Sequence, residues 1–377
     1  MTKSLARIAT ATFLISAFFV GVGHAASSNP PPTARGDGPA PESKPFYIER
    51  LDPALDTIIS KDAKLELEGD RYGLTEGPVW VQDNAGGYLL FSDLIANVIY
   101  KRTPGGEVSV FLDKAGYSGD DINNAGTQTY RGRTFVLMIG PNGETLDSQG
   151  RLIWCASPDG TIVRLEKDGT RTVLAGKYEG KRFNGPNDLV VTSNGSVYFT
   201  DSDFGLRGGS KSPDKELSFN GVYLVKDGKV TLLKSTADNP RAWPNGIALS
   251  PDERFLYLSE GFARIMKYEI KSDGTLGEPT VLTEGGGGIG DGMKFDLKGN
   301  LYSTGGAGPG HVRITAPDGT ILGRIYLPVI GGEPKQQICA TNVAFGDPDG
   351  KGLYITACEA VYRIRLKTAG YMPGGKR

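Results

Sequence analysis

Short apolar segments recur in pairs along the chain, and a polar turn separates the two members of each pair. "LVV" at 189–191 is followed by "VYF" at 197–199, and "IALSPDERFLYLSE" at 247–260 repeats the arrangement. Apolar residues at successive positions indicate strands buried on both faces, because a strand with one wet face alternates. The pattern predicts many short strands packed between neighbouring sheets.

Six such pairs can be aligned, and each unit adds two alternating segments around turns such as Asp-Gly. "GVYLVKDGKVTLLK", from residue 221, is one example. Four short strands in a unit of roughly 45 residues are typical of a propeller blade. The sequence therefore predicts an all-β fold, a single six-bladed β-propeller over residues 46–370. We expect the strand-like segment 46–60 to complete the last blade and close the ring.

The first residue of every unit carries a side-chain oxygen. These residues are Glu76, Asn142, Asn187, Asn245, Asp291 and Thr341. Because the innermost strands of a propeller run in the same direction along its channel, we expect all six at one mouth. Oxygen donors that include two carboxylates suit Ca²⁺, whereas a zinc site would call for His or Cys. The alternative is that Asn and Asp cap the turns before these strands, as they commonly do.

Five motifs stand in a characteristic order: "TEGPVW", "FNGPNDLVV…GSVYFTD", "WPNGIALSPD", "GDGMKFD" and "ATNVAFG…LYITA". In combination they resemble the senescence-marker-protein/gluconolactonase family of six-bladed propellers, which includes lactonases and luciferin-regenerating proteins. The resemblance implies a central divalent metal held by Glu76, Asn245 and Asp291, with Asn187 as a further ligand or substrate contact. It also implies lactone hydrolysis, with Asp291 of the "DG" unit in the proton-transfer role.

Asp188 is a second candidate for proton transfer. A carboxylate bound to a dication, as expected for Asp291, has a depressed pKa and is a poor base. Asp188 directly follows a predicted ligand without necessarily binding the metal itself. Strand alternation could turn it away from the channel, whereas a distortion just before Asn187 would let both side chains face the pocket. We expect Asn187, Asn142 and Asp201 to contact the substrate.

The predicted function is metal-dependent hydrolysis of a sugar lactone or related cyclic ester, in which the metal polarises the carbonyl and an Asp assists the attack of water. Two alternatives are metal-assisted cleavage of other esters, such as phosphotriesters, and a non-catalytic binding propeller with a structural calcium. A serine triad is nearly excluded, because removal of an export signal takes His24 and leaves His311. Residues 113–133 extend the first unit, either as a surface loop or as a lid over the pocket.

Residues 1–25 have the pattern of an export signal, with Lys3 and Arg7, an apolar stretch, and a small-residue exit. The apolar stretch is shorter than the ~20 residues of a comfortable membrane span, and a retained anchor is the alternative. Residues 26–45, rich in Pro, Ser and Gly, are predicted to form a flexible spacer, and 371–377 a tail. We expect an exported protein, periplasmic or secreted, without stable membrane insertion after signal removal.

The net charge of −1 gives no electrostatic reason to expect nucleic acid as a partner. Nothing in the sequence sets the oligomeric state. Cys339 and Cys358 stand beside neighbouring strand segments, so they form either a disulfide or two buried thiols. Cys155 is predicted to be a small core residue.

Overall fold

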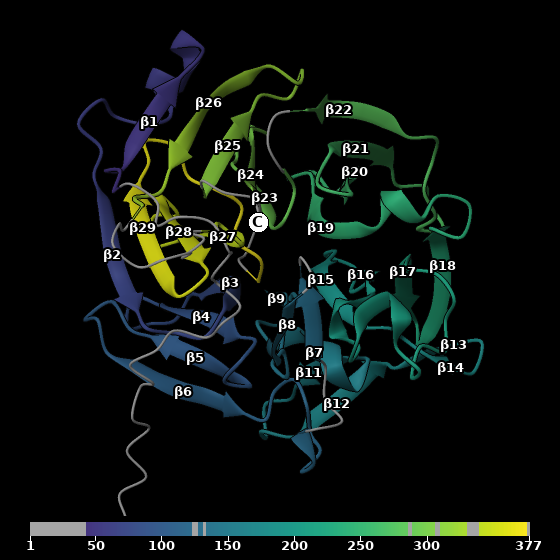
Figure 1. The fold of residues 1–377 in the computed structure, drawn as a ribbon. Coiled ribbons are helices and arrows are strands. Elements are labelled where there is room, and N and C mark those ends of the chain that lie inside the picture. Colours follow the sequence, from purple (N-terminus) through teal and green to yellow (C-terminus); the bar gives the residue numbers. More distant parts are fainter. Residues whose placement is uncertain are drawn as a thin grey trace, which may run out of the picture.

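The structure, a computed structural model, describes residues 43–122, 127–130, 133–285, 289–305, 310–329 and 339–374. In this part of the chain, six antiparallel sheets of four or five strands stand around a common centre (Figure 1). Their innermost strands contact one another in the order β3, β9, β15, β19, β23 and β27, and β27 contacts β3 again. The predicted six-bladed β-propeller is therefore confirmed.

The first three blades are built from consecutive strands, from the innermost to the outermost. They are β3 (Thr75–Val81), β4 (Tyr88–Asp93), β5 (Val98–Arg102) and β6 (Val108–Asp113); β9 (Glu144–Leu146), β10 (Leu152–Ala156), β11 (Thr161–Leu165) and β12 (Arg171–Ala175); and β15 (Pro186–Val191), β16 (Val197–Asp201), β17 (Gly221–Lys226) and β18 (Lys229–Ser235).

The last three blades follow the same order, and the last two each gain an outer strand from the beginning of the chain. They are β19 (Pro244–Leu249), β20 (Phe255–Glu260), β21 (Arg264–Glu269) and β22 (Thr280–Glu284); β23 (Met293–Phe295), β24 (Leu301–Gly305), β25 (His311–Thr315) and β26 (Ile321–Tyr326), with β1 (Tyr47–Arg50); and β27 (Asn342–Gly346), β28 (Gly352–Ala357) and β29 (Ala360–Arg365), with β2 (Leu65–Asp70).

The chain also forms short hairpins and 3₁₀ helices in addition to the strands of the blades. Two hairpins are β7 (Thr127–Tyr130) with β8 (Arg133–Leu137) and β13 (Lys177–Tyr178) with β14 (Lys181–Arg182). The 3₁₀ helices are η2 (Pro53–Thr57), η4 (Ser157–Asp159), η5 (Asp203–Gly205), η6 (Gly209–Lys211) and η7 (Pro240–Ala242). No helix among the described residues combines the length and the apolar character that crossing a membrane requires.

Local sequence explains the tight hairpins. Between β17 and β18, Asp227 and Gly228 have positive φ angles of 51° and 74°. Two successive residues with positive φ form the type I′ turn, whose twist matches that of the two strands it joins. The Lys-Asp-Gly segment therefore forms a hairpin, as its composition predicted.

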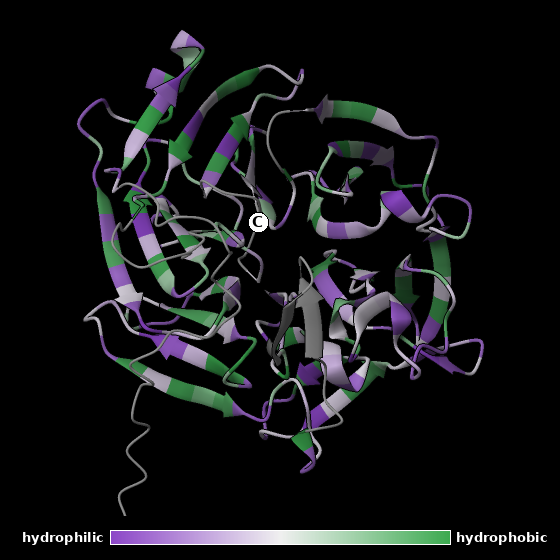
Figure 2. Ribbon diagram, viewed as in Figure 1, coloured by the Kyte–Doolittle hydropathy of each residue, from purple (hydrophilic) through white to green (hydrophobic). Residues whose placement is uncertain are grey.

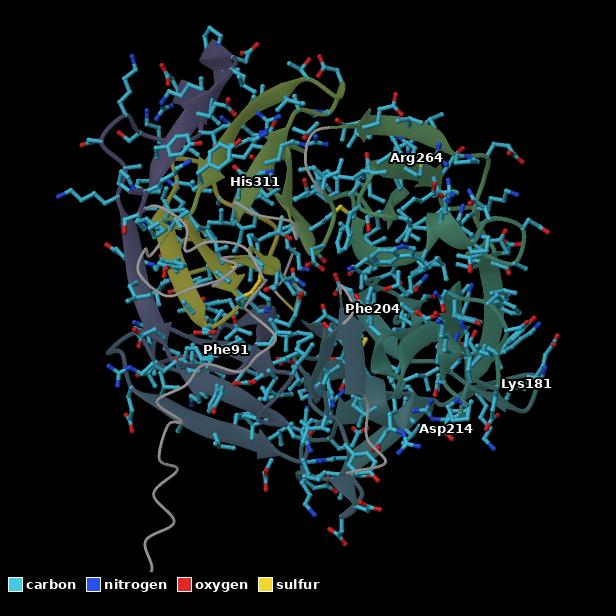
Figure 3. The ribbon with its side chains drawn as sticks, in the orientation of Figure 1. Phe91, Lys181, Phe204, Asp214, Arg264 and His311 are labelled. Carbon is cyan, nitrogen blue, oxygen red and sulfur yellow. A yellow bond between two sulfur atoms is a disulfide. The ribbon has the colours of Figure 1, made fainter. Side chains whose placement is uncertain are left out.

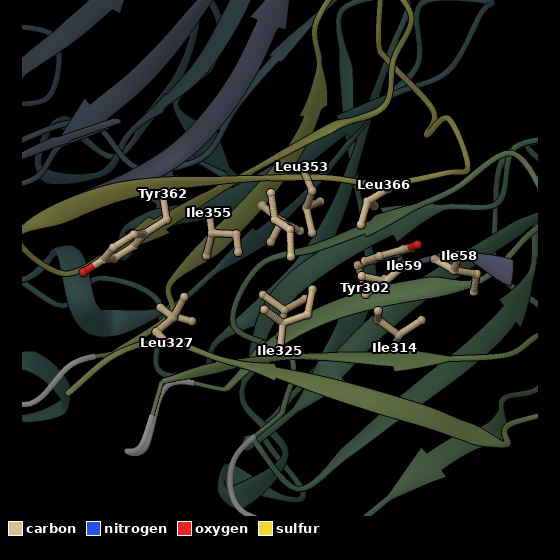
Figure 4. Packing of buried hydrophobic residues seen from close by; sticks show 14 of the residues in the cluster. Ile58, Ile59, Tyr302, Ile314, Ile325, Leu327, Leu353, Ile355, Tyr362 and Leu366 are labelled. Atoms are coloured by element: carbon tan, nitrogen blue, oxygen red, sulfur yellow. The ribbon is translucent and has the colours of Figure 1, made fainter. Parts of the chain in front are cut away.

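Each interface between neighbouring blades contains its own apolar cluster. The largest lies between the fifth and sixth blades and includes Tyr302, Ile314, Ile325, Leu353 and Ile355 (Figure 4). Hydrophobic positions follow the strands, whereas the connecting turns are mostly hydrophilic (Figure 2). Strands that are buried on both faces by adjacent blades thus account for the runs of successive apolar residues.

The closure of the ring differs from the prediction in one respect. Segment 46–60 forms β1, which pairs with β26 of the fifth blade, and then η2. The strand that completes the sixth blade is β2, which pairs antiparallel with β29. The prediction was wrong about the segment because "KLELEGD" alternates like an ordinary exposed strand and carries no sign of its partner.

Cys339 and Cys358 form a disulfide in the sixth blade, and Cys155 is a buried free cysteine. The predicted export signal and most of the predicted spacer lie outside the described residues. The predicted tail begins in contact with the propeller, because the Tyr371 N–H donates to the Phe295 carbonyl at 2.9 Å.

Candidate active site

The first strands of several blades are irregular where they begin at the channel mouth. Pairing with the second strand is shifted near the start of β3, β15 and β19. In β15 the shift lies between Pro186 and Leu189, so Asn187 and Asp188 stand outside the regular ladder. Such a bulge re-aims side chains that strict alternation would send to opposite faces. The distortion therefore lies at Asn187 and Asp188 themselves and not, as considered, just before Asn187.

The backbone carbonyls of several mouth residues accept hydrogen bonds from hydroxyl groups of the preceding blade. Ser92 donates to Asn142, Thr200 to Asn245 and Thr304 to Thr341, each at 2.7 Å. These bonds link the second strand of one blade to the first strand of the next. The positions of the mouth residues therefore depend on contacts between blades.

Glu76 of the first blade meets Asn342 of the sixth. The Asn342 amide Nδ2 donates to Glu76 Oε2 at 3.0 Å, and the Gly77 N–H donates to the same oxygen at 2.7 Å. Burial raises the pKa of Glu76 to about 7, and the charge of Asp188 adds to the rise. Glu76 is thus a buried acid whose ionised form is poorly compensated.

Asp291 of the fifth blade is electrostatically linked to Glu76. Burial raises the pKa of Asp291 well above its ordinary value, and the charge of Glu76 raises it further. The Asn245 side chain opposes this rise by a hydrogen bond. Neither Glu76 nor Asp291 forms an ion pair with a Lys or Arg of the described residues. Two acids therefore share one mouth without an ion pair, and the charge of Lys294 only partly offsets the rise in the pKa of Glu76.

Asp188 is almost completely buried, with 2% of its surface exposed. Its Oδ1 accepts from the Leu189 N–H at 2.9 Å, and its Oδ2 has no hydrogen-bond partner among the described residues. Burial raises the pKa of Asp188, whereas the positive charge of Lys294 and hydrogen bonds from the Leu189 and Ile247 N–H groups and the Asn342 side chain lower it. The second oxygen of this carboxylate is thus buried without a close hydrogen-bond donor.

Glycine occupies the second position of four units because the next blade lies too close for a side chain. A Cβ on Gly246 would lie 1.7 Å from the Asp291 carbonyl oxygen, and one on Gly292 would lie 1.9 Å from Asn342 Cγ. Asp188 and Asn342 are the exceptions at this position. Both accept a hydrogen bond from the N–H of the following residue.

Two predicted mouth residues are engaged elsewhere. The Thr341 hydroxyl donates to the Thr75 carbonyl at 2.7 Å, so the sixth unit contributes Asn342 to the mouth instead. Asp201 is fully buried, and its oxygens accept from the backbone N–H groups of Asn184 and Gly185. The structure therefore places Asp201 behind the turn that precedes Asn187, where it supports this turn, and not in the mouth as predicted.

The remaining predicted residues line the start of the inner strands. Asn142, Asn187 and Asn245 are buried, with 5 to 7% of their surfaces exposed. The Asn187 carbonyl accepts from the Gly143 N–H at 2.8 Å, which connects the second and third blades. Within the described residues, no three His, Cys, Asp or Glu side chains form a metal-binding group. The candidate donors at the mouth are thus two carboxylates and several amides.

The match to a family model described as "SMP-30/Gluconolactonase/LRE-like region" extends over residues 74–359. The chain belongs to this family. A gluconolactonase of Zymomonas mobilis is 36% identical over 338 residues, which are 86% of this chain and 87% of the relative. The family resemblance that the motifs indicated is confirmed.

Solved structures agree with this assignment. A gluconolactonase of Xanthomonas campestris superimposes with a TM-score of 0.68 at 30% identity, over 88% of this chain and 99% of the other. A luciferin-regenerating enzyme shares the fold, with a TM-score of 0.59 at 19% identity, over 84% of this chain and 99% of the other.

Glu144, in β9 of the second blade, is a buried acid of this chain that the sequence-based prediction did not include. It is 1% exposed, its Oε1 accepts from the Ser92 hydroxyl at 2.6 Å, and its Oε2 has no hydrogen-bond partner among the described residues. Burial raises the pKa of Glu144 well above its ordinary value. The third position of the other units is apolar, as at Leu189 and Ile247, so an acid in this register was the available signal.

The insertion in the first unit reaches across the second blade. Part of segment 113–133 lies outside the described residues, but the backbone of its strand β7 contacts η6 of the third blade. The loop that contains η5 and η6, residues 202–220, stands on the mouth side of the ring, because β16 ends there. The described strand β7 of the insertion therefore lies beside the loop of the third blade on the mouth side.

Proposed function

We propose that this protein is a divalent-metal-dependent lactonase that opens a sugar lactone or a related cyclic ester. The observation that carries the proposal is the pair of buried acids at the mouth, Glu76 and Asp291, whose pKa values are raised although the charge of Lys294 partly offsets the rise at Glu76. Two relatives that match most of the chain, from Zymomonas mobilis and Xanthomonas campestris, are gluconolactonases.

The donor set fits a hard divalent cation such as Ca²⁺. Glu76 and Asp291 would bind it by carboxylate oxygens, and Asn245 and Asn187 by amide oxygens, with no nitrogen or sulfur ligand. The two acids would supply the charge that compensates the ion. When bound, such a cation polarises the lactone carbonyl and stabilises the negative charge that develops on its oxygen.

Asp188 is the group that we assign to proton transfer. Its Oδ2 accepts a proton from water while the water oxygen bonds to the carbonyl carbon. The ester bond to the ring oxygen then breaks, and Asp188 returns the proton to this oxygen, so the products are one hydroxyl and one carboxylic acid. Asp291, the residue that the family resemblance favours, is the alternative proton carrier.

The amides have an orienting role in this proposal. Asn187 and Asn142 would hydrogen-bond the substrate hydroxyls, and Asp201 would act indirectly, as a positioning residue beneath the turn at Asn184 and Gly185. Fixing the substrate against the acids contributes to the rate by proximity.

We also propose that the protein works outside the cytoplasm, in the periplasm or after secretion. The pattern of residues 1–25 supports export. The disulfide between Cys339 and Cys358 supports the same assignment, because such bonds persist in oxidising compartments.

A panel of aldonolactones, other cyclic esters and phosphotriesters, assayed with and without a chelator, tests this function. We expect turnover of at least one lactone, its loss with chelator and its return with Ca²⁺. Turnover of phosphotriesters alone would show that the protein is another ester hydrolase and not a lactonase. Metal binding without turnover of any of these compounds would identify a binding propeller.

A further inference from the structure

A cavity of about 550 Å³ lies between the third and fourth blades on the mouth side of the ring. Its walls come from loop 202–220, which follows β16, and from loop 236–243, which follows β18. Both strands end at the face where the inner strands begin, so the cavity and the mouth share this face. Its volume falls within the ~300–1,000 Å³ that is typical of small-molecule sites.

One wall of the cavity is aromatic. The rings of Phe204 and Trp243 meet edge to face, with centroids 5.1 Å apart, and Phe219 also lines the space. Figure 3 shows Phe204 beside the inner strands, towards the middle of the ring. Aromatic rings offer flat, rigid surfaces to the C–H faces of a ligand.

Polar and charged side chains also line the cavity. Lys215 Nζ and Asp203 Oδ2 form an ion pair at 2.8 Å, and their side chains are 14% and 18% exposed. Ser210, Ser218 and Asn220 also line the cavity. Ionised groups make strong hydrogen bonds to hydroxyls. An alkyl chain would cover this ion pair without replacing its hydrogen bonds to water, which is costly.

The cavity is connected to the proposed catalytic residues through short stretches of backbone. Trp243 stands two residues before the mouth residue Asn245. The Asn184 amide Nδ2 donates to Asn220 Oδ1 at 3.2 Å, and Asn184 belongs to the turn that precedes Asn187. The cavity and the mouth therefore lie on the same face of the ring and are joined by segments of two or three residues.

From this arrangement we propose that the cavity is a subsite for a second sugar ring. The substrate is then an aldonolactone that carries a glycosyl group on one hydroxyl, an aldobionolactone, and not a free monosaccharide lactone. The aromatic wall receives the apolar face of the second ring, and Lys215 with Asp203 binds its hydroxyls. This inference rests on the proposed lactonase function and names its substrate class.

The kinetic test compares glucono-1,5-lactone with cellobionolactone and maltobionolactone. We expect kcat/KM for one disaccharide lactone to exceed that for gluconolactone by about tenfold, the value of one good hydrogen bond to a charged group. Lys215→Ala and Phe204→Ala should each remove this advantage and leave gluconolactone turnover unchanged. Lys211→Ala is the matched control, because Lys211 is an exposed residue of the same loop that does not line the cavity.

Equal kcat/KM for the monosaccharide and disaccharide lactones, in an enzyme that hydrolyses gluconolactone, would overturn the subsite. A preference for a lactone with an alkyl chain, or an advantage that survives both Lys215→Ala and Phe204→Ala, would also overturn it. Unchanged gluconolactone turnover in each variant shows that the variant is folded.

A binding measurement separates the subsite from the catalytic proposal. Trp80 and Trp154 are buried in clusters between blades, at 2% and 1% exposure, whereas Trp243 lines the cavity. Cellobionate or maltobionate, the open-chain products, should change the tryptophan fluorescence, and gluconate should change it far less. Trp243→Phe should abolish the signal. If no lactone is hydrolysed, this signal would still support the subsite, and its absence would overturn it.

Discussion

The carboxylates at the two ends of the inner strands have opposite environments. At the far end of the sixth blade, Asp347 accepts from Arg363 and Arg365 at 2.6 Å each and from the Tyr354 hydroxyl at 2.8 Å. Although burial alone would raise the pKa of Asp347, these hydrogen bonds outweigh it and lower the pKa. At the mouth, burial raises the pKa of Glu76 to about 7. Protein donors thus fill the hydrogen-bond capacity of the Asp347 carboxylate, whereas they do not fill that of Glu76.

The difference shows which acid stabilises the fold and which is prepared for a ligand. A buried carboxylate with several donors is a favourable structural element, whereas an uncompensated one costs free energy until a proton or a cation neutralises it. Asp347 belongs to the first class. Glu76, Asp188 and Asp291 belong to the second, and the proposed metal and substrate are what they lack.

The largest expected effect follows from Glu76→Gln. Removing one of two compensating charges should lower metal affinity and reduce kcat/KM by about 10³-fold, because metal polarisation supplies several kcal/mol of transition-state stabilisation. Steady-state assays at several Ca²⁺ concentrations measure both effects. Full activity of Glu76→Gln at low Ca²⁺ would show that Glu76 is not a ligand of the metal.

Asp188→Asn should have the next largest effect. If Asp188 carries the proton, the variant should bind metal nearly normally and lose about 10²-fold in kcat, the usual scale for loss of a general base. Metal occupancy is measured before the rate, so that the two effects stay separate. Near-normal kcat at full occupancy would assign proton transfer to Asp291.

At the end of the inner strands away from the mouth, Asp347→Asn should lower the stability of the protein and leave its catalytic activity unchanged. The substitution leaves Arg363 and Arg365 without a charged partner, which we expect to cost about 2 kcal/mol of unfolding free energy. Denaturant melts and lactone turnover test the two halves of this statement. An Asp347→Asn protein that is fully stable but inactive would reverse the comparison.

The pH dependence of stability should have opposite signs at the two ends. In metal-free protein, Glu76 holds its proton up to about pH 7, so stability should fall as pH rises from about 4.3 towards 7. Asp347 has a lowered pKa, so its contribution should be lost as pH falls below about 3.9. Unfolding measurements on the wild type, Glu76→Gln and Asp347→Asn at several pH values give these two pH dependences of stability. Glu76→Gln should reduce the dependence between about pH 4.3 and 7, and Asp347→Asn should reduce the dependence below about pH 3.9.

Much of this fold was predictable, because both faces of each strand are buried and the apolar runs repeat in every unit. The direction of the inner strands also predicted that Glu76, Asn187, Asn245 and Asp291 stand at the same end of these strands. By contrast, the choice between Thr341 and Asn342 depends on which of these two neighbouring side chains points towards the channel where β27 begins. That choice is made by contacts between blades, which a single sequence does not display.

Other features depended on packing between distant segments. The role of Asp201 follows from two backbone N–H groups that the turn at 184–185 presents to it. The partner of β2 is set by ring closure, and the cavity is formed by two loops, 202–220 and 236–243, that are separate in sequence. None of these arrangements leaves a periodic signal. Glu144 did leave one, because its unit breaks the apolar register.

Calorimetric titration of Ca²⁺ into chelator-treated protein tests the central claim most directly, namely that Glu76 and Asp291, the buried acids at the mouth, bind a cation. The wild type and Asp347→Asn should each bind one ion per chain with similar affinity, and Glu76→Gln and Asp291→Asn should bind it far more weakly. Unchanged Ca²⁺ binding in both mouth variants would contradict this account.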